Sequence, residues 1–247
     1  MTIGDPVFWL AVLQIIAIDV LLGGDNAVVI ALACRRLPPA QRNKGIFWGV
    51  FGAIALRIIL IFFALQLLAL PWLKLIGAIL LVWIGIKLLQ PEEGGDHGEV
   101  AASTHLFGAI RTIIIADAVM SLDNVVAVAA ASRNSMALVV FGIAVSVPII
   151  VGGSKLVLKL MDRFPIVITL GGMLLGWIAG EMAWSDAAFK AWTAQFPSLL
   201  HYLVAAAGAL LVLGVGKWLA RRVPEKPEKL IDLAEEQRSH SEQEQRR

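Results

Sequence analysis

The sequence predicts an all-α polytopic membrane protein with seven transmembrane helices, arranged as an inverted 3+3 repeat followed by one further helix. The first supporting observation is the composition, with 58% hydrophobic residues, 16% charged residues and a mean hydropathy of +0.78, which is more apolar than a soluble domain. The second is a set of seven apolar runs of about the length, roughly 20 residues, that a helix needs to cross a bilayer. The third is that motifs of the first half recur in the second half. The runs occupy roughly residues 6–33, 46–69, 71–89, 106–131, 136–158, 165–184 and 199–219.

Basic residues determine the expected orientation of these runs. The connection after the first run and the ends of the fifth and seventh runs are basic, whereas the opposite side has only Lys74, Arg133 and Lys190. Because Lys and Arg accumulate in cytoplasmic loops, we expect the N-terminus outside and the C-terminus in the cytoplasm. The basic residues expected in the cytoplasm are Arg35, Arg36, Arg42, Lys44, Lys155, Lys159, Arg163, Lys217, Arg221 and Arg222.

The third and sixth runs share one pattern of residues. In each, a proline is followed six residues later by a glycine and after six more by a tryptophan; these are Pro71, Gly77 and Trp83, and Pro165, Gly171 and Trp177. Since each repeat then contains three spans, the second must enter the membrane from the opposite side. The expected units are a first three-helix transmembrane repeat (1–90), an acidic cytoplasmic loop (91–105), a second inverted repeat (106–184), an outer loop with the seventh helix (185–222) and a charged cytoplasmic tail (223–247).

Two acidic motifs lie inside the first and fourth runs. Asp19 precedes Asp25-Asn26 by six residues, and Asp117 precedes Asp123-Asn124 by the same spacing. A carboxylate at the centre of a transmembrane helix costs about 2.5–3.5 kcal/mol on insertion scales, so four of them need a role that offsets roughly 10 kcal/mol. Binding a cation is the simplest such role.

The expected geometry makes one site from the two motifs. Gly23-Gly24 disfavours a regular helix in the first copy, and a break there would free carbonyls that a cation can satisfy. The second copy has Ser121-Leu122 instead, so the first half is expected to be the more unwound. Pseudo-twofold symmetry would bring the two Asp-Asn pairs together near the midplane. Carboxylate and amide oxygens suit Mg²⁺, Ca²⁺ or Mn²⁺ and not soft Cu(I). The predicted metal ligands are Asp19, Asp25, Asn26, Asp117, Asp123 and Asn124.

Each of these residues also has a structural interpretation. The outer acids, Asp19 and Asp117, could be neutralised by Arg57 in the second run or Lys155 in the fifth as intramembrane ion pairs. The two asparagines could simply bridge helices by hydrogen bonds, which stabilise packing by about 1 kcal/mol.

Several further residues are candidates for proton coupling or charge pairing. Arg57 and Lys155 are two of them; Ser121 could be a ligand or cap a distorted turn, and Glu181 could be a gate, a proton acceptor or an interfacial charge. Gly172, Gly176 and Gly180 form a ridge on the sixth run that favours close helix packing.

The acidic motifs resemble those of the TerC family of integral membrane proteins, which belongs to the LysE superfamily of exporters. The most specific stretches are Gly24-Asp25-Asn26-Ala27-Val28-Val29-Ile30 and Ser121-Leu122-Asp123-Asn124-Val125, and the resemblance covers roughly residues 1–220. Many family members carry Glu where this chain has Asp19. The resemblance implies seven spans in a bacterial inner membrane and Mn²⁺ export, with the six predicted ligands at the positions of the family's acidic motifs.

The function expected from sequence is therefore efflux of a divalent cation, Mn²⁺ first, by exchange for protons. Two alternatives remain open: a membrane scaffold or partner subunit that supports metalation of secreted proteins, and an exporter of another cation. Expected partners are the metal ion and the lipid bilayer, with a homo-oligomer and contact with secretion machinery left open. Nucleic acid is not expected because no basic patch with interleaved aromatics occurs. An enzyme is not expected, because the catalytic motifs of hydrolases and metalloproteases are missing from the sequence.

Overall fold

The computed structural model describes residues 6–22, 24–63, 66–67, 70–90, 99–131 and 136–222. The regular elements within these residues are all helices, as the sequence predicts. They are α1 (Pro6–Leu22), α2 (Gly24–Arg35), α3 (Pro39–Phe62), α5 (Leu73–Leu89), α6 (Glu99–Ala131), α7 (Met136–Arg163), α8 (Ile166–Trp184), α9 (Lys190–Thr193) and α10 (Ser198–Arg222).

Five described helices contain a stretch long and apolar enough to cross a membrane: α3, α6, α7, α8 and α10. The pair α1 and α2, which meet at an angle of 48°, is a sixth candidate if it forms one bent span. With 17 residues, α5 is shorter than these. The predicted membrane character is confirmed, whereas the arrangement of seven spans as an inverted repeat stays a prediction.

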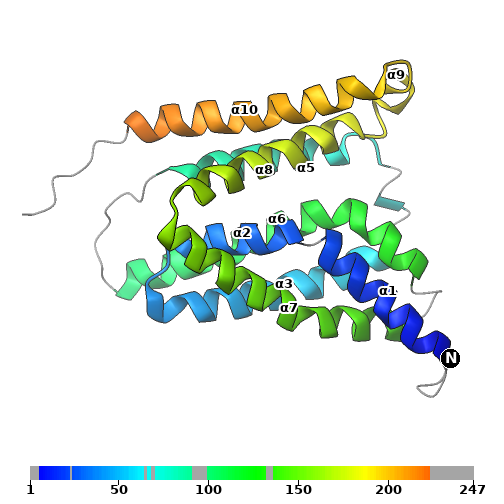
Figure 1. Cartoon of the computed structure of the whole chain (residues 1–247), viewed down its shortest axis with the longest axis horizontal. Coiled ribbons are helices and arrows are strands. Elements are labelled where there is room, and N and C mark those ends of the chain that lie inside the picture. The colour runs from blue at the N-terminus through cyan, green and yellow to red at the C-terminus, as the bar shows by residue number, and fades with distance from the viewer. Residues whose placement is uncertain are drawn as a thin grey trace, which may run out of the picture.

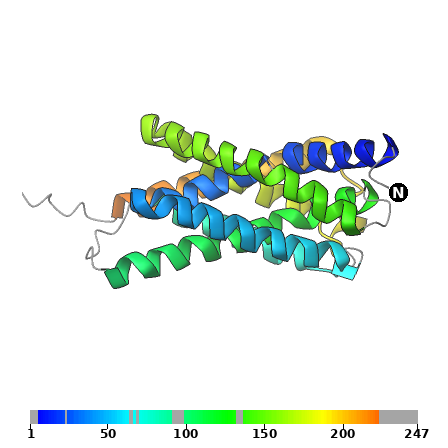
Figure 2. The ribbon, with the colours of Figure 1, turned by 90° about the horizontal axis from the view of Figure 1, so that it is seen from below.

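The helices form two groups that run along the long axis of the molecule (Figure 1). One group contains α5, α8 and α10, and the other contains α1, α2, α3, α6 and α7. Figure 2 shows α3 running between α6 and α7, both of which it contacts. A buried cluster that includes Leu32, Leu81, Met120 and Leu175 joins the two groups through α2, α5, α6 and α8. Many large apolar side chains face outward instead, as lipid contact requires.

The glycine ridge on α8 packs closely, as predicted. A Cβ on Gly176 would lie 2.4 Å from the carbonyl oxygen of Gly208, and one on Gly180 would lie 2.6 Å from Cα of Ala205, so α8 and α10 are in backbone contact. A Cβ on Gly172 would instead meet the side chain of Leu89 on α5. Small residues allow this approach because dispersion forces, which need close contact, drive helix association in lipid.

Two predicted boundaries differ from the structure. The second helix begins at Pro39 rather than near residue 46, and α6 begins at Glu99, so the last seven residues of the predicted loop 91–105 are helical. An apolar run marks the part of a helix that crosses the membrane, but the helix itself continues into polar residues beyond it. Proline at the first helical position also favours the earlier start of α3. Residues 91–98 and the predicted tail 223–247 lie outside the described residues.

Asp186, in the turn after α8, holds the start of α5. Its carboxylate accepts hydrogen bonds from the N–H groups of Trp72, at 2.9 Å, Leu75, at 3.0 Å, and Ala188, at 2.7 Å. Trp72 has φ of 69°, a left-handed conformation that is costly for a bulky residue. Burial alone raises the pKa of Asp186, but these backbone hydrogen bonds outweigh burial and hold the pKa below its usual value.

Candidate functional site

Arg57 is the centre of a buried charge cluster. This residue comes from α3, and its guanidinium contacts Asp19 of α1 and Asp117 of α6. Nη1 donates to Oδ1 of Asp19, and Nη2 donates to Oδ1 of Asp117 at 2.5 Å. Arg57 is 4% exposed, Asp19 is 3% exposed and Asp117 is 8% exposed. Two acids from separate halves of the chain therefore share one cation away from water.

Two serines complete the coordination of the acids. The hydroxyl of Ser146 on α7 donates to Oδ2 of Asp19, and that of Ser121 on α6 donates to Oδ2 of Asp117 at 3.2 Å. Both serines are fully buried. Each carboxylate thus has one oxygen bonded to Arg57 and the other to a serine, which comes from the same helix for Asp117 and from a different helix for Asp19.

Local helix structure places Ser146 at this point. Pro148 lies inside α7, two residues after Ser146, and proline lacks the N–H that would bond the carbonyl of Ala144. The hydroxyl of Ser146 also lies 2.8 Å from the carbonyl oxygen of Ile143, one turn back. The side chains of the cluster come from α1, α3, α6 and α7.

Asp25 and Asn26 lie in the first turn of α2, which begins at Gly24 after the bend. Oδ1 of Asp25 accepts a 2.9 Å hydrogen bond from the backbone N–H of Asn26, and an acid in the first turn is favoured by the helix dipole. Asn26 is 3% exposed, yet neither polar atom of its side chain has a hydrogen-bond partner among the described residues. Most buried polar groups in proteins are partnered, so this amide is unusual.

The charges of this region do not cancel. Asp25 lies within electrostatic range of both Asp117 and Arg57. Three carboxylates, counting Asp19, and one guanidinium leave a formal charge of −2. Among the described side chains, however, no three His, Cys, Asp or Glu residues converge on a point that could hold a metal ion. Any cation here would need amide or backbone oxygens, or the side chain of Asp123.

The second motif lies in the continuous helix α6. The side chain of Asp123 lies outside the described residues, and Asn124 is half-buried on the same helix. The helix runs unbroken through Ser121 and Leu122, whereas α1 and α2 are separate helices on either side of residue 23. The expectation that the first copy is the more unwound agrees with this difference, although Gly23 itself lies outside the described residues.

The remaining candidates lie elsewhere. Lys155 is exposed on α7, so Arg57 and not Lys155 is the partner of the outer acids. Glu181 on α8 accepts a 3.0 Å hydrogen bond from Nε1 of Trp177, four residues earlier. The matching residue of the first half is Lys87, whose Nζ lies 5.1 Å from the ring centroid of Trp83, also four residues earlier.

Sequence reasoning missed Ser146, for which the only signal is a hydroxyl inside an apolar run just before a proline.

The geometry can be set beside known proteins. A family profile described as "Integral membrane protein TerC family" matches residues 4–224. The chain belongs to this family. Its relatives include the "Uncharacterized membrane protein YjbE" of Bacillus subtilis strain 168, which is 45% identical over 76% of this chain and 85% of the relative. YceF of the same organism is 30% identical over 73% of each chain. The UPF0053 inner membrane protein YgdQ of Escherichia coli K12 is 25% identical over 67% of this chain and 76% of the relative. No solved structure matches the chain significantly.

TerC family membership confirms the resemblance drawn from the acidic motifs. It also agrees with the apolar helices in placing the chain in a membrane, and one group of relatives carries an inner-membrane name. The metal, the ligand residues, the orientation of the termini and the coupling ion stay predictions.

Proposed function

We propose that the chain exports a divalent metal cation, with Mn²⁺ as its substrate, and that Asp25 and Asn26 form half of the binding site. The amide of Asn26 carries this proposal, because it is buried and has no partner among the described residues. An unsatisfied buried polar group costs about 1–3 kcal/mol. A cation bound by Oδ1 of Asn26 and the carboxylate of Asp25 would satisfy the oxygen of this amide, so the residues present fit such a substrate.

The charge of the cluster supports a divalent substrate. Asp19, Asp25, Asp117 and Arg57 together carry a formal charge of −2, and Asp123, the proposed ligand from the second half, would add one more negative charge. A dication would offset most of this charge, and uncompensated charge is costly at membrane depth. Carboxylate and amide oxygens are ligands for hard divalent ions, a class that includes Mn²⁺. The resemblance in sequence is what selects Mn²⁺ within that class.

We place the site between two inverted repeats, 1–90 and 106–184. In such a repeat α1 and α2 correspond to α6, α3 to α7 and α5 to α8. Helix packing agrees with this correspondence: α3 packs on α6 as α7 packs on α1 and α2, and α5 packs on α8. The seventh helix of the proposal, α10, packs on α8 and α5, outside the pseudo-symmetric set. Rocking of one repeat against the other would then expose the site to each side in turn.

In this proposal Arg57 separates the roles of the acids. It holds Asp19 and Asp117 in the conformation described, so the inner Asp-Asn pairs bind the substrate there. The outer acids become ligands only in a conformation in which Arg57 has moved away. Asp123 and Asn124 supply the second half of the site by symmetry.

Export of a dication also needs an energy source. Moving two charges against an inside-negative potential of 100 mV costs about 4.6 kcal/mol. Exchange of two protons inward for each metal ion outward would be electroneutral. Carboxylates that bind a metal only when deprotonated would couple the two fluxes.

Flux through the purified chain in liposomes tests the proposal. Mn²⁺ entry, followed with a metal-sensitive dye, is expected to follow an imposed pH gradient and to fall at least tenfold in Asp25→Asn and in Asp123→Asn. Asp162→Asn is the matched control, because Asp162 is an exposed acid bonded to Arg42 outside the cluster.

The outcomes separate the open alternatives. Flux of another cation without flux of Mn²⁺ would show that the substrate is that cation and not Mn²⁺. Metal binding without any flux would favour the scaffold role. Unaltered flux in both Asp25→Asn and Asp123→Asn would show that the acidic motifs are not part of the transport path. Flux that does not respond to the pH gradient would overturn proton coupling.

A further inference from the structure

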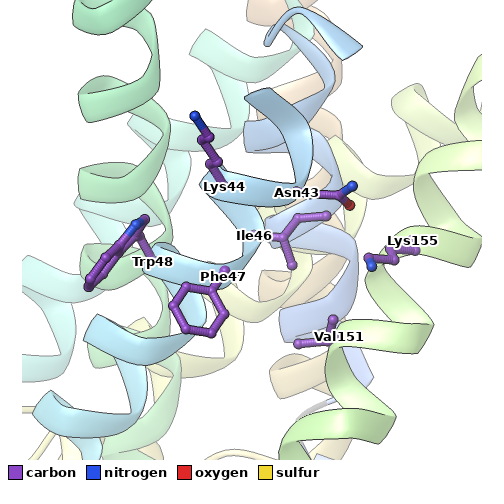
Figure 3. Close-up of a pocket in the computed structure, with 7 residues that line it drawn as sticks. All are labelled: Asn43, Lys44, Ile46, Phe47, Trp48, Val151 and Lys155. Carbon is purple, nitrogen blue, oxygen red and sulfur yellow. The ribbon is translucent and has the colours of Figure 1, made fainter. Parts of the chain in front are cut away.

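A cavity of about 450 Å³ lies between α3 and α7, away from the acidic cluster (Figure 3). Its walls come from the first turns of α3 and from the C-terminal half of α7. Figure 3 shows Asn43 and Lys155 approaching one another across the gap between the two helices. The lining residues are Asn43, Lys44, Ile46, Phe47, Trp48, Val151 and Lys155.

The polar part of the cavity is cationic. Lys44 and Lys155 come from different helices, are both exposed, and form no ion pair with any described residue. The nearest acid along α7, Asp162, bonds Arg42 at 2.8 Å and is therefore already paired. Lys159, one turn beyond Lys155, adds a third exposed cation at this end of the helix. An anion in the gap would therefore meet the ammonium group of Lys155 and the amide of Asn43, while Lys44, which lines the α3 side, points away from Lys155 (Figure 3).

Helix length places both lysines about one bilayer thickness from the far ends of α3 and α7. Eighteen residues separate Lys44 from the end of α3 at Phe62, which is about 27 Å of helix. Nineteen residues separate Lys155 from the start of α7 at Met136, about 28 Å. These lengths nearly equal the roughly 30 Å hydrocarbon core of a bilayer. If the far ends of both helices lie at one interface, the two lysines lie together at the other.

The other part of the cavity is apolar and open to the membrane. Phe47 and Trp48 follow Lys44 by three and four residues, so they lie on its face of α3, one turn deeper. They are 61% and 53% exposed, and their rings meet edge to face with centroids 5.5 Å apart. Ile149 of α7 is also more than half exposed. Exposed aromatic rings next to basic side chains are typical of membrane interfaces.

We propose that this cavity binds an anionic phospholipid of the surrounding bilayer. The phosphate would accept hydrogen bonds from Lys155 and Asn43, Lys44 would add positive charge at the same end of α3, and the acyl chains would lie along Phe47, Trp48 and Val151. A soluble anion would contact only the polar lining residues, whereas the cavity has polar and apolar lining residues side by side. Basic pockets between membrane helices are known to bind anionic headgroups. Under the predicted orientation this end of the molecule faces the cytoplasm.

Native mass spectrometry of the full chain in detergent tests the proposal, with phosphatidylglycerol as the probe and phosphatidylcholine as the neutral lipid. The wild-type chain is expected to retain one phosphatidylglycerol more tightly than phosphatidylcholine. Lys44→Gln and Lys155→Gln are each expected to weaken that binding about fivefold, and the double variant about 25-fold. Trp48→Ala should weaken both lipids, and Trp48→Phe should restore most of the loss.

A charge-matched control separates the cavity from general attraction. The double variant Lys217→Gln with Arg221→Gln removes the same charge from exposed positions of α10 outside the cavity and should bind phosphatidylglycerol as the wild type does. Equal weakening in this control would overturn the proposal. Inorganic phosphate that displaces the lipid with comparable affinity would also overturn it, by reducing the cavity to a free anion site. Equal retention of phosphatidylglycerol and phosphatidylcholine by the wild-type chain would also overturn the proposal. Folding of each variant is checked by its melting temperature in the same detergent.

Discussion

Nη2 of Arg57 donates a 2.5 Å hydrogen bond to Oδ1 of Asp117, and this contact joins α3 to α6 inside the helix bundle. The same guanidinium bonds Asp19 of α1. One guanidinium therefore pairs with two carboxylates at positions where an isolated charge would be costly. Each acid is also bonded to a serine, Asp117 to Ser121 of its own helix and Asp19 to Ser146 of another helix. The spacing of the acidic motifs alone does not predict these contacts.

Replacing Arg57 by methionine should strongly destabilise the protein. The variant leaves Asp19 and Asp117 buried without their cation, and loss of one partner of a buried ion pair costs about 3–5 kcal/mol. Adding Asp19→Asn and Asp117→Asn to Arg57→Met should recover much of that loss, because the unpaired charges are then gone. The free energy of unfolding in mixed micelles measures both effects. Arg111→Met, at an exposed position of α6, should change little; a similar cost there would mean that Arg57 acts only through general packing.

The sequence predicts the membrane class and the helix content well, because apolar runs of bilayer length have few other interpretations. It also predicts the close packing of Gly176 and Gly180, since a four-residue spacing places small residues on one helix face. Pairing in three dimensions is harder. Arg57 and Lys155 are equivalent in sequence as partners for Asp19, and only the packing of α3 between α6 and α7 brings Arg57 to the acids. Ser146 has no sequence signal strong enough to assign it.

Ser146→Ala tests whether the serine stabilises the cluster. Its hydroxyl bonds a carboxylate oxygen of Asp19, and a hydrogen bond to a charged group contributes about 1.5–3 kcal/mol. We expect a loss of that size in the free energy of unfolding. Ser154→Ala is the matched control, because Ser154 is equally buried on α7 but bonds the carbonyl oxygen of Ile150 in its own helix at 2.7 Å. Equal losses in the two variants would contradict a special role for Ser146.

Asn26→Leu should separate stability from transport. The amide of Asn26 is buried without a partner among the described residues, so an apolar side chain of similar size should leave stability unchanged or raise it by about 1 kcal/mol. The same substitution removes a proposed ligand and should abolish metal flux. Thermal unfolding in detergent and dye-based flux in liposomes give the two readouts. A marked fall in stability would instead mean that the amide bridges helices structurally.

Gly176→Ala should force α8 and α10 apart. The added Cβ would lie 2.4 Å from the carbonyl oxygen of Gly208, a backbone atom that cannot move without its helix. Overpacking of this kind costs about 1–3 kcal/mol. The control is Gly214→Ala on α10, the helix that carries Gly208. Its added Cβ would have no atom within 4 Å, so the variant should be as stable as the wild type or slightly more stable. The melting temperatures of Gly176→Ala and Gly214→Ala test this prediction, and equal values would show that α8 and α10 separate without loss of stability.

Asp186→Asn should lower stability at neutral pH and lose this effect in acid. The folded-state pKa of Asp186 lies below its usual value of 3.8, because backbone N–H groups stabilise the carboxylate more than burial disfavours it. A depressed pKa contributes stability that is present above about pH 4 and is lost as the pH falls through the folded-state pKa. The melting temperature of the variant should therefore lie a few degrees below that of the wild type at pH 7. The difference in melting temperature should shrink as the pH falls toward 3, because the wild-type carboxyl group then becomes protonated.

Other acids titrate alike in the wild type and in Asp186→Asn, so their effects cancel in this difference. A gap that stays constant from pH 7 to pH 3 would show that the carboxylate charge does not hold Trp72 and Leu75 at the start of α5.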